Sequence, residues 1–324
     1  MVDTAVDKKV LSVILVTLMF TKVSPIGVST RDFCYTERWC EPGVWFKTFL
    51  YCINAVQLYP SPVNVNPDYL VRNMSMTPLM LVNFDTLQPG PWILKNIRNT
   101  VALNFGPGMQ VMGGNFPKVY ETLYALFRWG SAVSNGSEHT YNNRRYPMEM
   151  QIFHVVHPYP DVLIALYSEA KSVAALSIFI DVSVTHCLDL LCMCVVGNQV
   201  AVSPVVLRNL LPEDISKFYR YEGAMTFPDC LPIVSWLIFE EPIYISQKQY
   251  KRFFSEVYYH EPDEEPPKLL VKNFRPVTTL GFRILEVSPN ATIPPKDSVS
   301  GLSANVLAVL SACLVSLLMK WMSY

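Results

Sequence analysis

This sequence has no excess of basic over acidic residues, or of acidic over basic ones, large enough to give it a strong net charge. Its 26 basic and 27 acidic residues leave a formal net charge of -1, which gives no electrostatic reason to expect a nucleic-acid partner. No internal repeat is apparent, and the 25 prolines are scattered rather than gathered into a linker. Neither a G-x-S-x-G nucleophile elbow nor a glycine-rich phosphate loop stands out. These absences favour one continuous domain that belongs to neither of those two enzyme classes.

The first apolar run is short. Residues 10–20 follow Lys8 and Lys9 and fall well short of the roughly 20 residues that cross a bilayer. Their length and flanks are typical of a cleaved secretory signal peptide, which we predict over residues 1–29, with a membrane-spanning helix as the alternative. The mature domain is then expected over residues 31–289.

A second apolar run lies near the end of the chain. Residues 302–319 are apolar enough to enter a bilayer and follow a short stalk over residues 290–301. They predict a C-terminal tether, either a GPI lipid-anchor signal that is removed or a single transmembrane helix. The expected location is the extracellular face of the plasma membrane, and three N-glycosylation sequons agree with that route: Asn73, Asn135 and Asn290.

Eight cysteines in a secreted chain indicate disulfide bonds. We predict two pairs: Cys34 with Cys40, and Cys52 with Cys230. Three further cysteines lie in an apolar stretch, where buried free thiols are expected rather than a metal site: Cys187, Cys192 and Cys194.

Four runs are rich in β-branched and aromatic residues and are bounded by turn formers, which is typical of strands: residues 122–129, 149–156, 175–182 and 233–239. Helices are predicted over residues 246–258 and 186–196. Since alternate residues of a strand share a face, Leu126 and Arg128 should point to one side and Phe127 to the other. If residues 149–156 form the neighbouring strand, Arg128 and Gln151 face a common space.

Several sequence blocks, in this order, resemble the α-carbonic anhydrases. They run from residues 61–63 to residues 273–276 and include Phe-Arg-Trp-Gly at 127–130 and Gly-Ser-Glu-His-Thr at 136–140. The resemblance implies a mainly β fold with peripheral helices around a large, twisted, mostly antiparallel central sheet. The cysteine placement and the apolar C-terminus look most like the membrane-anchored extracellular branch of that family.

In active members of the family, three histidines hold a zinc ion that lowers the pKa of bound water to about 7 and supplies hydroxide for attack on carbon dioxide. The resemblance places Leu126, Arg128 and Gln151 at these ligand positions. Leucine has no lone pair, guanidinium is permanently cationic, and an amide oxygen is a poor zinc ligand. Asn99 replaces the histidine that passes protons to solvent and cannot titrate near neutral pH. Neither zinc nor another cofactor is therefore expected.

Other family positions are partly retained. Thr226 and Glu138 correspond to a gatekeeping threonine and its glutamate partner, and Glu149 to a glutamate that orients the third histidine. Phe227 replaces a second threonine and is expected at the pocket mouth. Tyr124 replaces a glutamine that supports the first histidine. The positions that resemble the lining of the substrate pocket are Phe153, Ala175, Met225 and Trp236.

Glu138 and Glu149 would be costly to bury without a compensating cation. We therefore expect the Arg128 guanidinium to bond to Glu138, Glu149 or Gln151 and to replace zinc structurally. The alternative is that Arg128 is a surface residue on an edge strand.

The sequence thus predicts a catalytically inactive carbonic anhydrase-like module that binds an unidentified extracellular protein or glycan. One alternative is an active carbonic anhydrase, catalysing reversible CO2 hydration with zinc on unexpected ligands such as His139 and a carboxylate. Another is a small-anion binder at Arg128.

Overall fold

The computed structural model describes residues 33–52, 59–156, 170–183, 199–259 and 268–294. Chain contacts divide the protein into a unit that ends at Thr292 and a second that begins at Ile293. Outside the described residues lie the predicted signal peptide, the apolar run at 302–319, the helix predicted over 186–196, and Cys187, Cys192 and Cys194. No helix within the described ranges combines the length and apolarity that a bilayer crossing requires.

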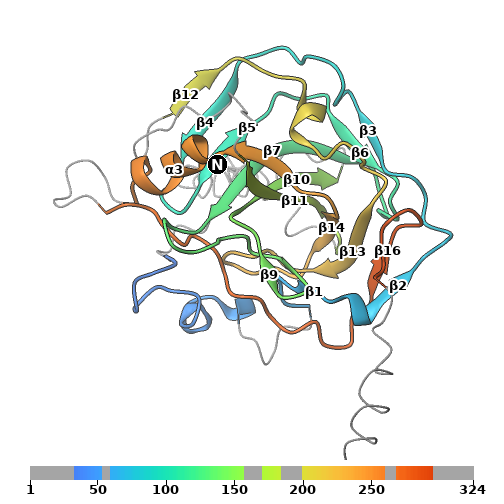
Figure 1. Cartoon of the computed structure of the whole chain (residues 1–324), viewed down its shortest axis with the longest axis horizontal. Helices are drawn as coiled ribbons and strands as arrows, with labels where there is room; N and C mark the ends of the chain where they lie inside the picture. Colours follow the sequence, from blue (N-terminus) through green and yellow to red (C-terminus); the bar gives the residue numbers. More distant parts are fainter. Residues whose placement is uncertain (1–32, 53–58, 157–169, 184–198, 260–267, 295–324) are drawn as a thin grey trace, which may run out of the picture. The chain divides into compact units, whose positions relative to one another are not determined.

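Strands dominate the domain (Figure 1). They are β1 (Asn64–Val65), β2 (Leu70–Arg72), β3 (Met80–Val82), β4 (Trp92–Asn96), β5 (Val101–Asn104), β6 (Gln110–Met112), β7 (Tyr120–Trp129), β8 (Thr140–Tyr141), β9 (Arg144–Arg145), β10 (Met148–Val156), β11 (Val173–Ser183), β12 (Gln199–Val202), β13 (Phe218–Gly223), β14 (Val234–Phe239), β15 (Ile243–Ser246) and β16 (Leu285–Val287). Among the described residues, the α-helix is α3 (Gln247–Glu256), and the 3-10 helices are η1 (Trp45–Lys47), η2 (Leu50–Cys52), η3 (Pro67–Tyr69) and η4 (Leu207–Leu210).

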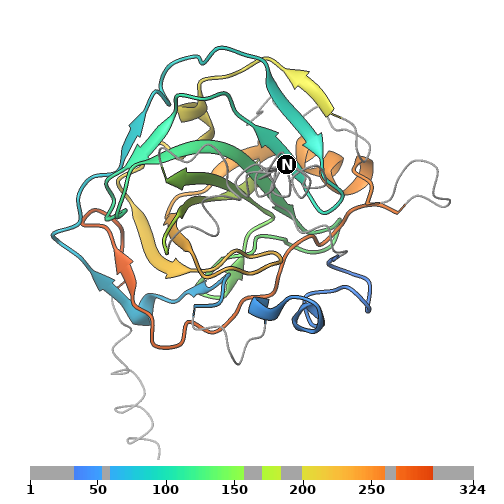
Figure 2. The same ribbon diagram turned by 180° about the vertical axis from the view of Figure 1, so that it is seen from behind.

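The main sheet follows the order β12-β4-β5-β7-β10-β11-β14-β13-β16-β2, with β15, β3 and β6 paired beside it. Most neighbours are antiparallel, as predicted, but β11 runs parallel to β14 and β15, and β16 runs parallel to β2. Seen from either side, β7, β10 and β11 cross the middle of the fold (Figure 2). The four predicted strands correspond to β7, β10, β11 and β14.

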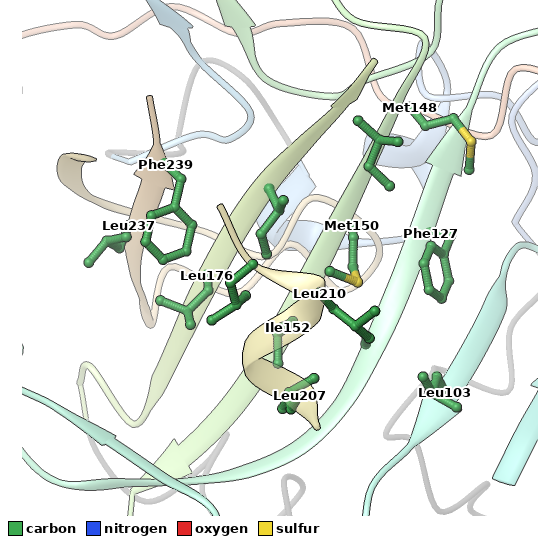
Figure 3. Close-up of a cluster of buried hydrophobic side chains, with 14 of the residues drawn as sticks. Leu103, Phe127, Met148, Met150, Ile152, Leu176, Leu207, Leu210, Leu237 and Phe239 are labelled. Atoms are coloured by element: carbon green, nitrogen blue, oxygen red, sulfur yellow. The ribbon is translucent and has the colours of Figure 1, made fainter. Parts of the chain in front are cut away.

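An apolar core covers one face of the central strands. Figure 3 shows Phe127 of β7 and Ile152 of β10 beside Leu207 and Leu210 of η4. Leu176 of β11 joins the same cluster and has no exposed surface. Burial of such side chains is the main favourable contribution to folding.

Helix α3 packs at the edge of this core. Its start is fixed by a capping box, because Ser246 Oγ accepts a hydrogen bond from Gln249 N–H and the Gln249 side chain accepts one from Ser246 N–H. The helix predicted over 246–258 is therefore correct in place, but the observed α3 begins one residue later and ends two residues earlier. Phe253 projects from α3 onto the rings of Phe127 and Trp129.

Both predicted disulfide pairs are present. Cys34–Cys40 closes a short loop, whereas Cys52–Cys230 joins residues 178 apart in the sequence. The first bond thus closes a loop within the N-terminal segment, residues 33–52, and the second attaches this segment to the rest of the domain. Two disulfides are typical of proteins that mature in the secretory route.

Candidate functional site

Neighbouring strands bring the three predicted ligand positions together. β7 and β10 pair antiparallel, with Leu126 opposite Gln151 and Arg128 opposite Glu149. Because alternate residues share a face, these four side chains lie on the side of the sheet opposite the apolar core. None is more than 1% exposed. Arg128 is therefore on a central strand, not an edge strand.

The loop over residues 136–140 carries Glu138 onto this face. A side chain at Gly136 would overlap the backbone of Trp129 and Gly130, so glycine permits the loop to lie directly against the end of β7. The N–H groups of Glu138 and His139 then donate to Glu149 Oε2 at 2.7 and 2.8 Å. Glu149 therefore fixes the loop as well as facing the site.

Arg128 pairs with Glu138. Its Nε lies 3.3 Å from Glu138 Oε2, an ion pair that leaves Nε without a hydrogen bond. A nitrogen of its guanidinium donates to the Tyr35 hydroxyl at 2.7 Å, and the rings of Tyr35 and Phe227 lie 5.5 and 5.6 Å from the guanidinium carbon. Burial lowers the pKa of Arg128, but the charges of Glu138 and Glu149, together with Tyr35, outweigh it and leave that pKa raised.

Gln151 joins the two carboxylates. Its amide Nε2 donates to Glu138 Oε2 at 2.8 Å and to Glu149 Oε1 at 2.9 Å, whereas its own oxygen has no partner. Burial raises the pKa of Glu149, but the charge and hydrogen bond of His139, with help from Gln151, lower it to about 2. Ser177 of β11 donates to the same carboxylate at 2.8 Å. Glu149 is therefore held as a fully bonded anion.

Both ring nitrogens of His139 are engaged. Nδ1 lies 2.8 Å from Glu149 Oε1, and Nε2 lies 2.7 Å from the Tyr221 hydroxyl. Tyr221 continues the chain of contacts to Ser61 Oγ at 2.8 Å. The Trp236 ring stacks on Tyr221 and meets the edge of His139. His139 therefore has the partners of a structural side chain.

The structure changes the expected arrangement at Thr226 and Phe227. Thr226 Oγ1 is buried without a hydrogen-bond partner, so it does not bond to Glu138, whose oxygens are taken by Gln151 and the Arg275 N–H. Phe227 is 4% exposed and packs on Arg128 rather than standing at a pocket mouth. Asn99 has a buried side-chain oxygen without a partner.

The remaining pocket positions close around one another. The Phe153 ring contacts the rings of Tyr124, Phe227 and Trp236, with ring centres 5.5 to 5.9 Å apart. Ala175 lies opposite both Phe153 and Trp236 in the strand register. These aromatic contacts fill the side of the site next to Arg128, and Met225 beside Thr226 is only 4% exposed.

Three contributors were not anticipated from the sequence. Tyr35 reaches Arg128 from the N-terminal segment, Asn273 accepts from Arg128 through its carbonyl at 3.4 Å, and Arg275 donates its N–H to Glu138 Oε1 at 2.9 Å. Sequence signals existed for each, because Tyr35 adjoins a disulfide cysteine and the other two lie in the block over residues 273–276.

The three sequon asparagines lie apart from this site. Asn73 donates to Glu286, Asn135 to the Arg145 carbonyl and Asn290 to Ser216. Asn135 and Asn290 are exposed, and Asn73 is partly exposed.

The donor set does not fit a zinc ion. Zinc requires converging lone pairs, but at Glu138 Oε2 the Arg128 guanidinium forms an ion pair and Gln151 Nε2 donates an N–H, while Leu126 offers no lone pair. Across the described ranges, no group of three or more His, Cys, Asp or Glu residues is arranged to hold a metal ion.

Comparisons with known proteins agree on the family. A profile described as eukaryotic-type carbonic anhydrase matches residues 40–289. Carbonic anhydrase 4 of Rattus norvegicus is 30% identical over 234 residues, which cover 69% of this chain and 73% of that protein. Carbonic anhydrase 15 of Mus musculus is 29% identical over 300 residues, covering 87% and 90%. Receptor-type tyrosine-protein phosphatase zeta of Homo sapiens is 29% identical over 215 residues, covering 63% of this chain and 9% of that receptor. The chain therefore belongs to the eukaryotic-type carbonic anhydrase family.

Proposed function

We propose that this chain is a carbonic anhydrase-like domain without hydratase activity, and that it serves as a binding or adhesion module at the cell surface. One observation carries the first part: Arg128 and Gln151 converge on Glu138, so a built-in cation and an amide occupy this face of β7 and β10. The carboxylate lone pairs that converge there accept N–H groups of Gln151 instead of holding the metal that would generate hydroxide.

The binding role is supported by what remains of the domain. The family frame is preserved around a buried polar cluster, and a similar region forms 9% of the length of a receptor-type phosphatase. The two disulfides support passage through the secretory route. We propose an extracellular protein or glycan as partner and a C-terminal membrane tether, whether lipid or helix, with glycans at Asn73, Asn135 and Asn290.

The geometry disfavours both alternatives. A zinc site built on His139 would require a free ring nitrogen, but both nitrogens lie within hydrogen-bond distance of other groups. An anion at Arg128 would have to displace Glu138 from a guanidinium that is 1% exposed. Breaking a buried pair is costly, so a surface anion has little access to this charge.

Metal analysis and stopped-flow CO2 hydration test the catalytic part of the proposal. The purified chain should contain far less than one zinc per molecule, and added zinc should not accelerate hydration above buffer. The matched variant replaces Leu126, Arg128 and Gln151 together with histidine, and should gain about one zinc because the strand register and Glu149 are retained. Stoichiometric zinc with rapid hydration in the unaltered chain would refute the proposal.

The binding part needs its own test. Cells that display the full chain should bind other cells, or a defined set of extracellular proteins and glycans, more strongly than cells that display an unrelated tethered domain. Absence of any such difference would leave an inactive domain without the proposed role and would contradict this second part.

A further inference from the structure

A pocket of about 370 Å³ lies beside residues 275–279, which follow Phe274. Pro42, Gly43 and Pro60 line one side, and residues 275–279 line the other. The two sides are joined by backbone bonds, since Thr278 N–H donates to the Pro62 carbonyl at 2.7 Å. The pocket is therefore built on paired segments and lies outside the cluster of Arg128, Glu138 and Gln151.

Arg275 is the charged residue in the lining of this pocket. Its side chain is almost fully buried, because the residue is 4% exposed. One guanidinium nitrogen donates to the Ser61 carbonyl at 2.9 Å, and the group lies 5.9 Å from the centre of the Trp45 ring. Within the part of the chain that the structure describes, the Arg275 guanidinium forms no ion pair, and several of its N–H groups remain available.

Glu138 does not neutralise this cation by direct contact. Glu138 accepts a bond from the Arg275 backbone N–H, not from its side chain, and its carboxylate is already paired with Arg128 and bonded by Gln151. Burial lowers the pKa of Arg275, while the distant charge of Glu138 opposes this effect. A guanidinium stays protonated under these conditions, and a buried cation without its own counter-ion is costly.

The lining indicates what kind of counter-ion fits. Pro42, Pro60, Pro276 and Val277 give the pocket an apolar wall, and none of the lining residues is acidic. A guanidinium binds a carboxylate through two parallel hydrogen bonds. A single cation matches one negative charge, which favours a carboxylate over a phosphate dianion.

We propose that this pocket binds a monoanionic carboxylate carried on a small apolar group, with Arg275 bonding the carboxylate and the proline-lined wall packing on the apolar part. The site is separate from the degenerate zinc position, and it does not depend on whether the domain is catalytically inactive. Its volume is within the range of small-molecule pockets.

A ligand-observed NMR titration of the full chain in a neutral detergent tests the proposal, with benzoate as probe and benzamide as its neutral counterpart. Benzoate should bind saturably, and at least about tenfold more tightly than benzamide or inorganic phosphate, because benzamide lacks the charge and phosphate lacks the apolar ring that packs on the proline-lined wall. Equal affinity for benzamide, preference for phosphate, or no saturable benzoate binding would each overturn the proposal.

Variants locate the binding. Val277→Trp should abolish it by filling the pocket, because Val277 lines the cavity and is 39% exposed, so the larger ring need not disturb the core. Arg275→Lys keeps the positive charge but loses the paired N–H donors of the guanidinium, and should weaken benzoate binding about tenfold. Arg144→Gln removes an exposed arginine elsewhere and should leave it unchanged. Undiminished binding by Val277→Trp contradicts the assigned site even if an Arg275 variant fails to fold.

Discussion

The two faces of β7 and β10 are buried to the same extent but differ in composition, because only one of them carries charged groups. One face presents Phe127 and Ile152 to the apolar core, and the other presents Arg128, Glu149 and Gln151. All five residues are at most 3% exposed. Burial alone therefore does not distinguish a hydrophobic core from a polar cluster in the same strands.

The difference lies in how each face is stabilised. The apolar face gains free energy roughly in proportion to the area removed from water, without strict geometry. The polar face is stable only if each charge keeps its partner, because an unpaired buried group costs its full desolvation. We therefore expect the polar face to respond to loss of a single partner and to pH in ways that the apolar face does not.

The largest expected effect follows the loss of Arg128. Arg128→Met should lower the free energy of unfolding by about 3–5 kcal/mol, because Glu138 then remains buried without its cation. Urea unfolding at neutral pH measures this loss.

A double variant tests the reason for that loss. Arg128→Met combined with Glu138→Gln should be more stable than Arg128→Met alone by about 2 kcal/mol, because no uncompensated charge is left behind. If the two losses simply add, Arg128 does not compensate Glu138 and the two faces are less different than proposed.

Acid should destabilise the polar face through Glu149, by a smaller amount than the loss of Arg128. The pKa of Glu149 is lowered from 4.5 to about 2 in the folded protein, so its contribution is fully present above its ordinary pKa and is lost as pH falls towards 2. The shift corresponds to roughly 3 kcal/mol. The free energy of unfolding, measured by urea titration from about pH 6 to about pH 2, should show this decline.

Two variants serve as controls for the pH dependence. Glu149→Gln should be less stable than the unaltered chain at neutral pH but should lack this part of the acid sensitivity. Leu176→Ala, on the apolar face, should lose about 2–5 kcal/mol at every pH, because it removes packing rather than a titrating group. A Glu149→Gln variant that declines as steeply in acid as the unaltered chain would assign the effect to another residue.

Sequence patterns predicted the strands that carry both faces. The period-2 alternation in β7 and β10 placed Arg128 and Gln151 on one side, and the register shows that they do share it. The parallel pairing of β11 with β14 was not predictable in the same way, because alternation fixes the faces of a strand but not the direction of its neighbour.

The partners of the polar face were only partly predictable. Glu138 was among three expected partners of Arg128, but Tyr35 lies 93 residues away in the sequence and belongs to no strand. The inward position of Phe227 also escaped prediction, because family correspondence gives a residue's place in the chain and not the direction of a new, larger side chain. Contacts between irregular segments have no periodic signature in the sequence.

Tyr35 provides the smallest and most specific test of the comparison, because it shows that the polar face extends to the N-terminal segment. Tyr35→Phe keeps the ring beside Arg128 but removes the hydroxyl that accepts the 2.7 Å bond, and should cost about 1–2 kcal/mol in the free energy of unfolding. Tyr146→Phe is the matched control, since Tyr146 is also buried and stacks on Phe179 while its hydroxyl has no hydrogen bond within the described residues. That change should stay within about 0.5 kcal/mol. Equal losses in both variants would mean that the Tyr35 hydroxyl adds nothing beyond its ring, and that the polar face ends at the sheet.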